Sequence, residues 1–267
     1  MIRCALFCLL GAMAAQAGEA NALSGEQADL QAAMVVEAAL MTRTAGGGDE
    51  REALARLDQV FAGLEAKYPR SAVIRDEHGS FLWWEQREGE AFAKWHEAEQ
   101  RDGGNPNICQ HLGSALLESG QIVEGIGYLE RAASLAPSDA TLQYTLGTDL
   151  YLFRHQMTTA REPEAAVVDR ALAALRRAVE IDPTNASYAE GYAQTFYSIP
   201  IPRWPEAIQA WQHLYDISGK KDFAAINLAR VSLLMHDGAA ARGYLEKVHS
   251  PAFEALKTKL MAHATSM

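Results

Sequence analysis

Residues 106–139 read PNICQHLGSALLESGQIVEGIGYLERAASLAPSD, and the pair Leu112-Gly113 in this stretch returns 34 positions later as Leu146-Gly147. Small residues repeat with the same period in a second phase, as Ala91 and Gly125 and then as Ala207 and Ala241. A period of about 20 to 50 residues indicates stacked helix–turn–helix units, each of which buries its apolar face only against its neighbours. The chain is therefore expected to present a surface to another molecule.

Apolar residues recur at helical spacing within this stretch, and turn residues mark where its helices end. The apolar positions are Leu112, Leu116, Ile126, Leu129, Ala132 and Leu135. Gly120 interrupts them where two helices need a tight turn. Pro137 ends this unit and Pro183 ends the next, because proline stops a helix and a following Asn, Asp or Ser can cap the next one.

These residues resemble the tetratricopeptide repeat family. The family pattern has Leu-Gly in the first helix, followed by a small residue, an aromatic residue or leucine, alanine and proline. The quoted unit carries it in Leu112-Gly113, Leu116, Gly125, Leu129, Ala132 and Pro137. The resemblance covers five to six repeats over residues 50–250 and implies an all-α fold, a right-handed α-solenoid of stacked antiparallel helix pairs.

The repeat pattern also predicts how the chain is organised. We expect a degenerate helical repeat at residues 18–71, with its first helix near residues 24–43, and a tetratricopeptide-like solenoid at residues 72–250. After Pro251, a helix from Ala252 to His263 is expected to cap the open end of the stack within residues 251–267.

The first 17 residues predict a secretory signal peptide. Arg3 gives a positive start, residues 4–15 are apolar, and small residues precede a cleavage site before Gly18. A second set of small residues at 20–22 leaves the cleavage position open by about five residues, and an uncleaved anchor stays an alternative. We therefore expect an exported protein, periplasmic or secreted.

The net charge limits the classes of partner that the chain can bind, and the number of cysteines limits the disulfides that could stabilise it. The formal net charge is −10, which speaks against nucleic acid and anionic membranes as partners, because both are bound mainly through Lys and Arg. No segment after the signal peptide is long and apolar enough to span a bilayer. Removal of the signal peptide leaves Cys109 alone, so we expect no intramolecular disulfide and a small buried thiol.

The family resemblance implies a concave surface lined by the first helix of each repeat. Its second, fifth, ninth, twelfth and thirteenth positions here combine aromatic rings with hydroxyls and amides, and they are short of positive charge. Such a groove suits a protein or extended peptide, and it does not fit an acidic C-terminal tail. The expected partner-binding residues of the groove are Trp83, Trp84, Asn107, Gln110, Ser114, Tyr144, Thr148, Tyr151, Gln194 and Tyr197.

Alternatives remain for the aromatic members of this set. Packing within the superhelix is the alternative for Tyr144 and Tyr151. Trp83 and Trp84 are adjacent on one helix and point about 100° apart, so they cannot share one environment. At least one of the two is expected to face the groove.

Three repeats are longer than 34 residues, and the excess falls between their two helices. The insertions lie at residues 46–48, 153–162 and 199–205. Turns of one type lie on one edge of a solenoid, and insertions there often form a binding face; neutral growth of tolerant loops is the alternative. Trp204 lies between prolines, where a large apolar side chain needs a partner or a local pocket, so it joins the partner-binding residues.

The sequence carries no catalytic, metal-binding or cofactor-binding motif. Residues 96–100 begin like a helical zinc-protease motif but lack its second histidine. The chain has no Cys-x-x-Cys pair, phosphate-binding loop or Gly-x-Ser-x-Gly elbow. We therefore predict a non-enzymatic adaptor or assembly factor of the bacterial envelope. The alternatives are a small-molecule or glycan-binding module and a self-associating structural solenoid, which would form homo-oligomers.

Overall fold

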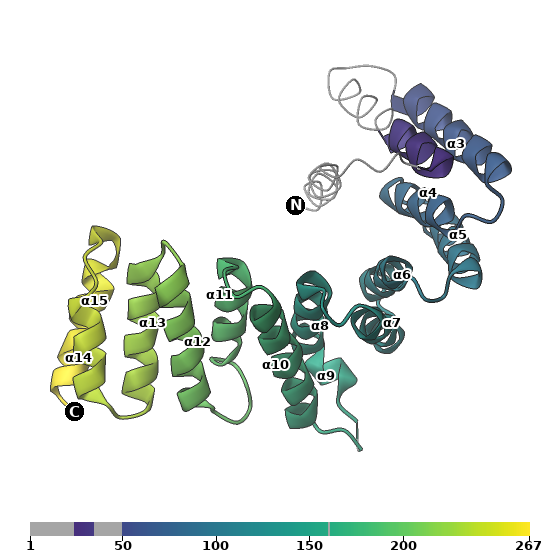
Figure 1. Ribbon diagram of the computed structural model, residues 1–267. Helices are drawn as coiled ribbons and strands as arrows, with labels where there is room; N and C mark the ends of the chain where they lie inside the picture. Colours follow the sequence, from purple (N-terminus) through teal and green to yellow (C-terminus); the bar gives the residue numbers. More distant parts are fainter. Residues whose placement is uncertain (1–23, 35–49, 160) are drawn as a thin grey trace. The chain divides into compact units, whose positions relative to one another are not determined.

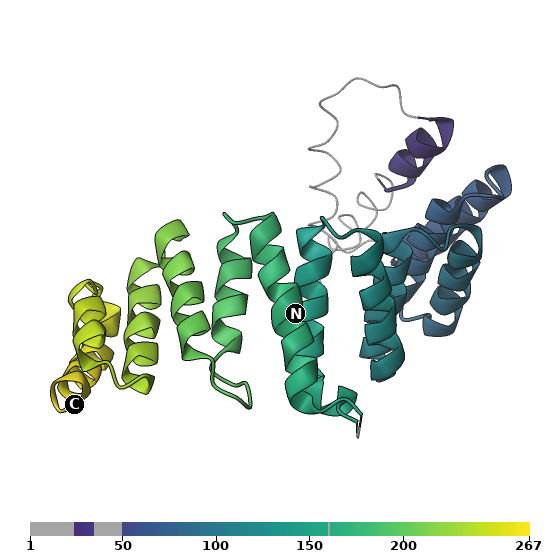
Figure 2. The same cartoon turned by 60° about the horizontal axis from the view of Figure 1, so that its bottom comes forward.

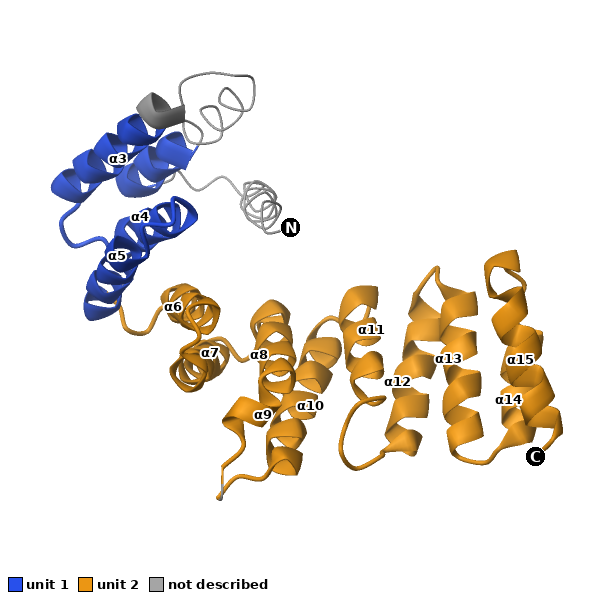
Figure 3. Cartoon of the chain, turned by 180° about the vertical axis from the view of Figure 1, so that it is seen from behind, with its two compact units in different colours: residues 1–101 blue, residues 102–267 orange. Residues whose placement is uncertain are grey.

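The computed structural model describes residues 24–34, 50–159 and 161–267, and these ranges contain helices and no strand. The chain divides into two compact units, residues 1–101 and residues 102–267, which are coloured separately in Figure 3. Unit 1 denotes the first and unit 2 the second. The predicted all-α class is confirmed. The signal peptide and the insertion at residues 46–48 lie outside the described residues.

The described part of unit 1 contains two helix pairs. Residues 25–34 are helical and precede α3 (Glu50–Lys67), and α4 (Ala72–Trp84) is followed by α5 (Glu88–Arg101). The described helical residues 25–34 fall within the range predicted for the first helix of the N-terminal repeat; the rest of that range lies outside the described residues. α4 begins at a cap, because the Ser71 side chain accepts a hydrogen bond from the Ile74 backbone N–H at 3.1 Å.

Unit 2 is a stack of helix pairs, as Figures 1 and 2 show. Its helices are α6 (Pro106–Glu118), α7 (Ile122–Leu135), α8 (Ala140–Leu152), α9 (Arg154–Met157), α10 (Glu164–Ile181), α11 (Ala186–Thr195), α12 (Trp204–Ile217), α13 (Lys221–Leu234), α14 (Gly238–Glu246) and α15 (Glu254–Thr265). The pairs are α6/α7, α8/α10, α11/α12 and α13/α14. α15, which follows a short 3₁₀ turn (η1, Pro251–Phe253), packs on α13 and α14. The stacked pairs confirm the predicted solenoid.

Side-chain caps fix where the first helices of three pairs begin. Asn105, Asp139 and Asn185 each precede such a helix, and their side-chain oxygens accept one hydrogen bond (Asn105) or two (Asp139 and Asn185) from backbone N–H groups of the first turn. Asp139 and Asn185 each follow a proline, Pro137 and Pro183, as the turn residues predicted. Gly120 ends α6 with a φ of +81°, a conformation that glycine adopts without strain.

Small residues let paired helices approach closely. A Cβ at Gly113 would lie 3.0 Å from the backbone oxygen of Gly125, and a Cβ at Gly147 would lie 2.7 Å from Leu175 Cγ. Side chains at these positions would push the two helices of a pair apart. The repeated Leu-Gly pair thus places a leucine in the core and a glycine at the helix crossing.

The insertions of unit 2 lie between the two helices of a pair. α9 occupies part of the predicted insertion at residues 153–162, and α10 begins directly after Pro163. The sequence placed Trp204 in a loop, but Trp204 is the first residue of α12. The reason is Pro205, because proline is favoured in the first turn of a helix, where its missing N–H costs nothing.

Candidate functional site

The first helices of unit 2, α6, α8, α11 and α13, carry most of the predicted partner-binding residues; we call their exposed side the first-helix face. On it, the rings of Tyr144 on α8 and Tyr188 on α11 lie 4.7 Å apart. The Thr141 and Tyr188 hydroxyl oxygens are 3.0 Å apart. A Cβ at Gly191 would lie 2.3 Å from Tyr144 Oη, so this glycine makes room for the tyrosine. The sequence did not predict the roles of Tyr188 and Gly191.

A second tyrosine, Tyr197, lies in the turn after α11 and is fixed by α13. Its hydroxyl donates to the backbone oxygen and to Oδ1 of Asn227, each at 3.1 Å. The Arg230 guanidinium lies 4.8 Å from the centre of the Tyr197 ring. Burial raises the pKa of Tyr197 to about 12, although the charge of Arg230 opposes the rise. Tyr197 is therefore a neutral hydrogen-bond donor at physiological pH.

The same first helices also carry polar side chains. Asn107, Thr148 and Gln194 are exposed, whereas Gln110 and Ser114 are partly buried. The Gln194 amide nitrogen donates to Glu190 at 2.9 Å, and its amide oxygen accepts no hydrogen bond from a described residue. Amides and hydroxyls of this kind can bond the backbone of an extended peptide.

The end of α8 combines a tyrosine, an arginine and an unpaired carboxylate. The Arg154 guanidinium lies 4.5 Å from the centre of the Tyr151 ring and donates to Glu164 at 3.1 Å. Asp149 is partly buried, and its carboxylate has no hydrogen-bond or ion-pair partner in the described part of the chain. Burial raises the pKa of Asp149 to about 6.

Trp83 and Trp84 belong to unit 1, and both are partly buried. The Trp83 ring contacts the rings of Phe92 and Trp95 on α5, in each case with 5.8 Å between centroids. Trp83 therefore packs within the helix pair α4/α5, which makes it a poor position for probing binding by mutation. Trp204 likewise packs against the apolar cluster around Trp211 in unit 2.

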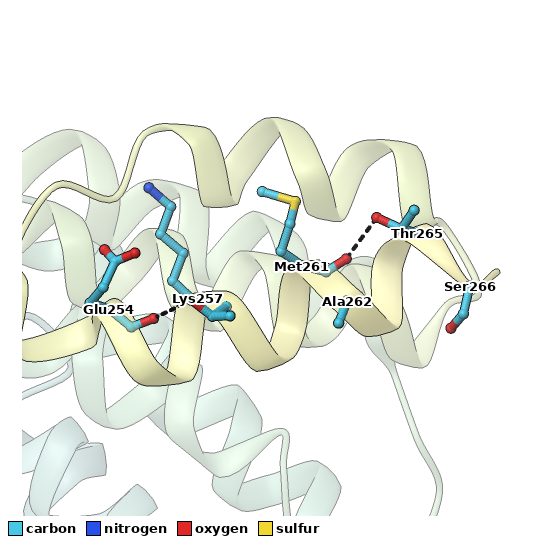
Figure 4. Close-up of a pocket in the computed structure, with 7 residues that line it drawn as sticks. Glu254, Lys257, Met261, Ala262, Thr265 and Ser266 are labelled. Carbon is cyan, nitrogen blue, oxygen red and sulfur yellow. Dashed lines mark hydrogen bonds between the residues drawn. The ribbon is translucent and has the colours of Figure 1, made fainter.

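The described residues offer no metal site, since they contain no group of three or more His, Cys, Asp and Glu side chains arranged to hold an ion. None of the helices in the described ranges is both long and apolar enough to cross a bilayer. A shallow hollow runs along α15, where Figure 4 shows Glu254, Lys257 and Met261 among the lining residues. Thr258 and Thr265 donate to carbonyls of their own helix at 3.0 and 2.9 Å, so the hollow is a strip along one helix.

Solved structures of other proteins share this fold. YrrB, described as a tetratricopeptide repeat protein with an unusual peptide-binding site, aligns at a TM-score of 0.57 and 17% identity over 78% of this chain and 98% of that protein. PilF of Pseudomonas aeruginosa aligns at 0.54 and 15% identity over 91% and 99%, and MamA at 0.52 and 18% over 72% and 93%. The chain has the tetratricopeptide repeat fold. No protein-family model and no curated protein matches the sequence.

The tetratricopeptide arrangement also explains which residues the sequence analysis missed. Asn227 and Arg230 lie on α13, the first helix of the fifth repeat. With Leu228-Ala229 at the seventh and eighth positions of that repeat, Asn227 is at the sixth position and Arg230 at the ninth. The expected groove residues were counted over four repeats and stopped before this helix. Counting one repeat further from Leu228-Ala229 would have placed Arg230 on the same face as Gln194 and Thr148.

Proposed function

We propose that this chain is an exported, non-enzymatic tetratricopeptide repeat protein that binds a protein or extended peptide on the first-helix face of unit 2. The observation that carries the proposal is the pairing of fixed rings with exposed polar groups on that face. Tyr144 is held by a ring contact to α11 and Tyr197 by hydrogen bonds to α13, while Asn107, Thr148 and Gln194 are exposed on α6, α8 and α11.

Fixed rings favour peptide binding for an energetic reason. A side chain already held in one conformation loses little entropy when a ligand stacks on it. Tyrosine also combines a broad apolar surface with a polar tip, which suits contact with mixed sequences. The exposed amide and hydroxyl groups supply hydrogen bonds to an extended backbone.

The proposed place of action is the bacterial envelope, where the protein would serve as an adaptor or assembly factor. Support for export comes from the sequence of residues 1–17, and support for peptide binding comes from YrrB, which has the same fold and a peptide-binding site. Mass spectrometry of the protein from fractionated cells tests export. A mature N-terminus at Gly18 or within the next five residues in the envelope fraction supports export, and an intact N-terminus in the cytoplasm contradicts it.

The binding face is tested with two matched variants of the mature chain. Gln194→Arg places a long charged side chain on the first-helix face, and Gln209→Arg makes the same change on exposed α12. A photo-cross-linking residue at Thr148 identifies the bound polypeptide. We expect Gln194→Arg to lower its capture at least fivefold and Gln209→Arg to leave it unchanged. Equal capture by both variants would place binding elsewhere.

A further inference from the structure

Arg230 carries a positive charge that no carboxylate neutralises within the described part of unit 2. It is exposed and lies on α13, the last of the four first helices. Two other exposed arginines of this unit, Arg176 and Arg177, pair with Glu180 at 3.8 and 3.4 Å. An acidic chain offers an excess of carboxylates, so an arginine that pairs with none of them is available to a ligand.

The Arg230 side chain is held in one orientation. Its guanidinium lies over the Tyr197 ring, and its Nη1 donates to Asn227 Oδ1 at 3.3 Å. Asn227 is itself fixed, because it is only 3% exposed and its Nδ2 donates to the Phe223 backbone oxygen at 2.9 Å. The remaining N–H groups of Arg230 donate to no described residue, and a planar guanidinium presents such groups in the spacing of a carboxylate.

An apolar side chain lies beside this charge. Leu234 follows Arg230 by four residues on α13, so the two lie on the same side of the helix. Leu234 is 47% exposed, so it offers apolar surface to a ligand beside the guanidinium. A ligand that carries a carboxylate next to an apolar group would satisfy both side chains.

We infer that Arg230, seated on Tyr197 and Asn227, is a carboxylate-binding site on the first-helix face. The carboxylate belongs either to the chain terminus of the bound polypeptide or to one of its acidic side chains. That the ligand is a polypeptide rests on the proposed function. That it carries a carboxylate rests on the geometry around Arg230. The sequence predicted a face short of positive charge from four repeats. Arg230 of the fifth repeat adds a positive charge to that face.

Small probes test the site without knowledge of the natural partner. N-acetyl-leucine carries a terminal carboxylate beside an apolar side chain, N-acetyl-glutamic acid α-amide carries a side-chain carboxylate, and N-acetyl-leucinamide carries none. Each is titrated into the isotope-labelled mature chain, and NMR shifts are followed at the Arg230 side-chain N–H and the Asn227 and Tyr197 amides. We expect both acids to shift these signals and the amide to bind at least fivefold more weakly. Tighter binding of N-acetyl-leucine than of the glutamic acid derivative identifies a chain terminus, and the reverse order identifies an acidic side chain.

Two arginine variants decide whether Arg230 is responsible. Arg230→Gln should abolish the saturable shifts, whereas Arg177→Gln, which removes an exposed and paired arginine from α10, should leave them unchanged. Unchanged helical circular dichroism in both variants excludes unfolding as the cause. Binding of the acids that persists in Arg230→Gln, or equal binding of the amide, would overturn the inference.

Failure of this inference differs from failure of the proposed function. If Gln194→Arg loses polypeptide capture but no acid binds at Arg230, the carboxylate site is wrong and the peptide-binding face is supported. Acid binding at Arg230 in a protein that captures no polypeptide would keep the site and remove the proposed partner class.

Discussion

The seventh position of the first helix is His78 in unit 1, whereas the matching positions in two repeats of unit 2 carry Leu112 and Leu146. The two ring nitrogens of His78 lie 2.7 Å from a Glu65 oxygen and 3.1 Å from an Asp58 oxygen, and the ring is 6% exposed. Leu146 lies instead in an apolar cluster. The first helix of a pair is thus held by hydrogen bonds to carboxylates of the preceding helix, α3, in unit 1 and by apolar packing in unit 2.

The charges of unit 1 form a connected network around His78. Lys94 donates to Glu65 at 2.7 Å, and Arg87 donates to Asp58 at 3.0 Å. Burial raises the pKa of Asp58 and of Glu65, but hydrogen bonds from these cations and from His78 outweigh burial and leave both values lowered. A buried imidazole is tolerated at a leucine position because carboxylates of the preceding helix surround it, so unit 1 depends on ionised carboxylates for its stability.

The largest effect is expected at the helix crossings, where Gly147→Ala and Gly79→Ala compare the two units. A Cβ at Gly147 would lie 2.8 Å from the backbone nitrogen of Leu175 and 2.9 Å from the oxygen of Ala171, which cannot move separately from their helix. We expect a loss of about 3 kcal/mol. At Gly79 the obstacle is the Trp95 ring, at 2.8 Å, and a smaller loss of ~2 kcal/mol should follow because a side chain can shift.

Urea unfolding followed by helical circular dichroism measures both losses. The control is Gly127→Ala in α7, where an added Cβ meets nothing within 4 Å. This change should raise stability by about 0.5 to 1 kcal/mol, because alanine is the better helix former. A larger loss at Gly79 than at Gly147 would show that unit 1 is the more rigid of the two at this crossing.

His78→Leu gives unit 1 the residue that unit 2 uses at this position. We expect a loss of about 2 kcal/mol, because Asp58 and Glu65 each lose a hydrogen-bond partner while remaining partly buried. Hydrogen exchange resolved by peptide assigns the loss to unit 1. In the double variant with Glu65→Leu the combined loss should be smaller than the sum of the single losses, whereas strict additivity would show that the two side chains do not stabilise each other.

The repeat plan could be predicted from the sequence because its signals are local. The Leu-Gly pairs, the capping residues and the prolines act within one helix or turn, and each marks its element independently of the rest of the fold. The insertion that precedes α10 was predicted for the same reason. The start of α12 was missed because Trp204 was interpreted by its apolar character, although Pro205 after it favours a helix start.

The details of the face were harder to predict because they depend on contacts between repeats. Tyr188 is at a third position, outside the expected set, and it reaches the face only because α8 and α11 bring its ring against Tyr144. The network of His78 uses carboxylates of α3, whose register against α4 the sequence does not state. Spacing within one helix predicts which side a residue occupies, but it does not predict its partner on another helix.

The pKa of Asp149 in unit 2 is raised, whereas the pKa values of Asp58 and Glu65 in unit 1 are lowered. We therefore expect Asp149→Asn to stabilise unit 2. The pKa of Asp149 rises from 3.8 to about 6 through burial, which makes ionisation at pH 7 unfavourable for the folded state. The full shift corresponds to ~3 kcal/mol, and solvent screening of a partly exposed group reduces this to about 1 to 2 kcal/mol. Urea unfolding at pH 7 should show this gain.

The pH dependence separates the two carboxylate environments. A raised pKa in the folded state means that unit 2 gains stability as the pH falls from about 7 through 6 towards 4. The lowered values of Asp58 and Glu65 mean that unit 1 loses stability only as the pH falls below about 4 and those groups become protonated. Hydrogen exchange should therefore show stronger protection of unit 2 at pH 5 than at pH 7. Asp149→Asn should abolish that difference. A difference that persists in the variant would assign it to another group.

The smallest expected difference compares two buried tryptophans that fill matching gaps, Trp95 in unit 1 and Trp211 in unit 2. Trp95 Nε1 donates to the Asp76 backbone oxygen at 3.1 Å, whereas Trp211 Nε1 has no hydrogen-bond partner in the described structure. Trp→Phe at either position removes a similar volume, so the difference between the two losses isolates the hydrogen bond. We expect Trp95→Phe to cost about 1 kcal/mol more than Trp211→Phe, measured by urea unfolding. Equal losses would mean that Trp211 Nε1 bonds to a buried water, since an indole N–H without any partner loses no hydrogen bond on substitution.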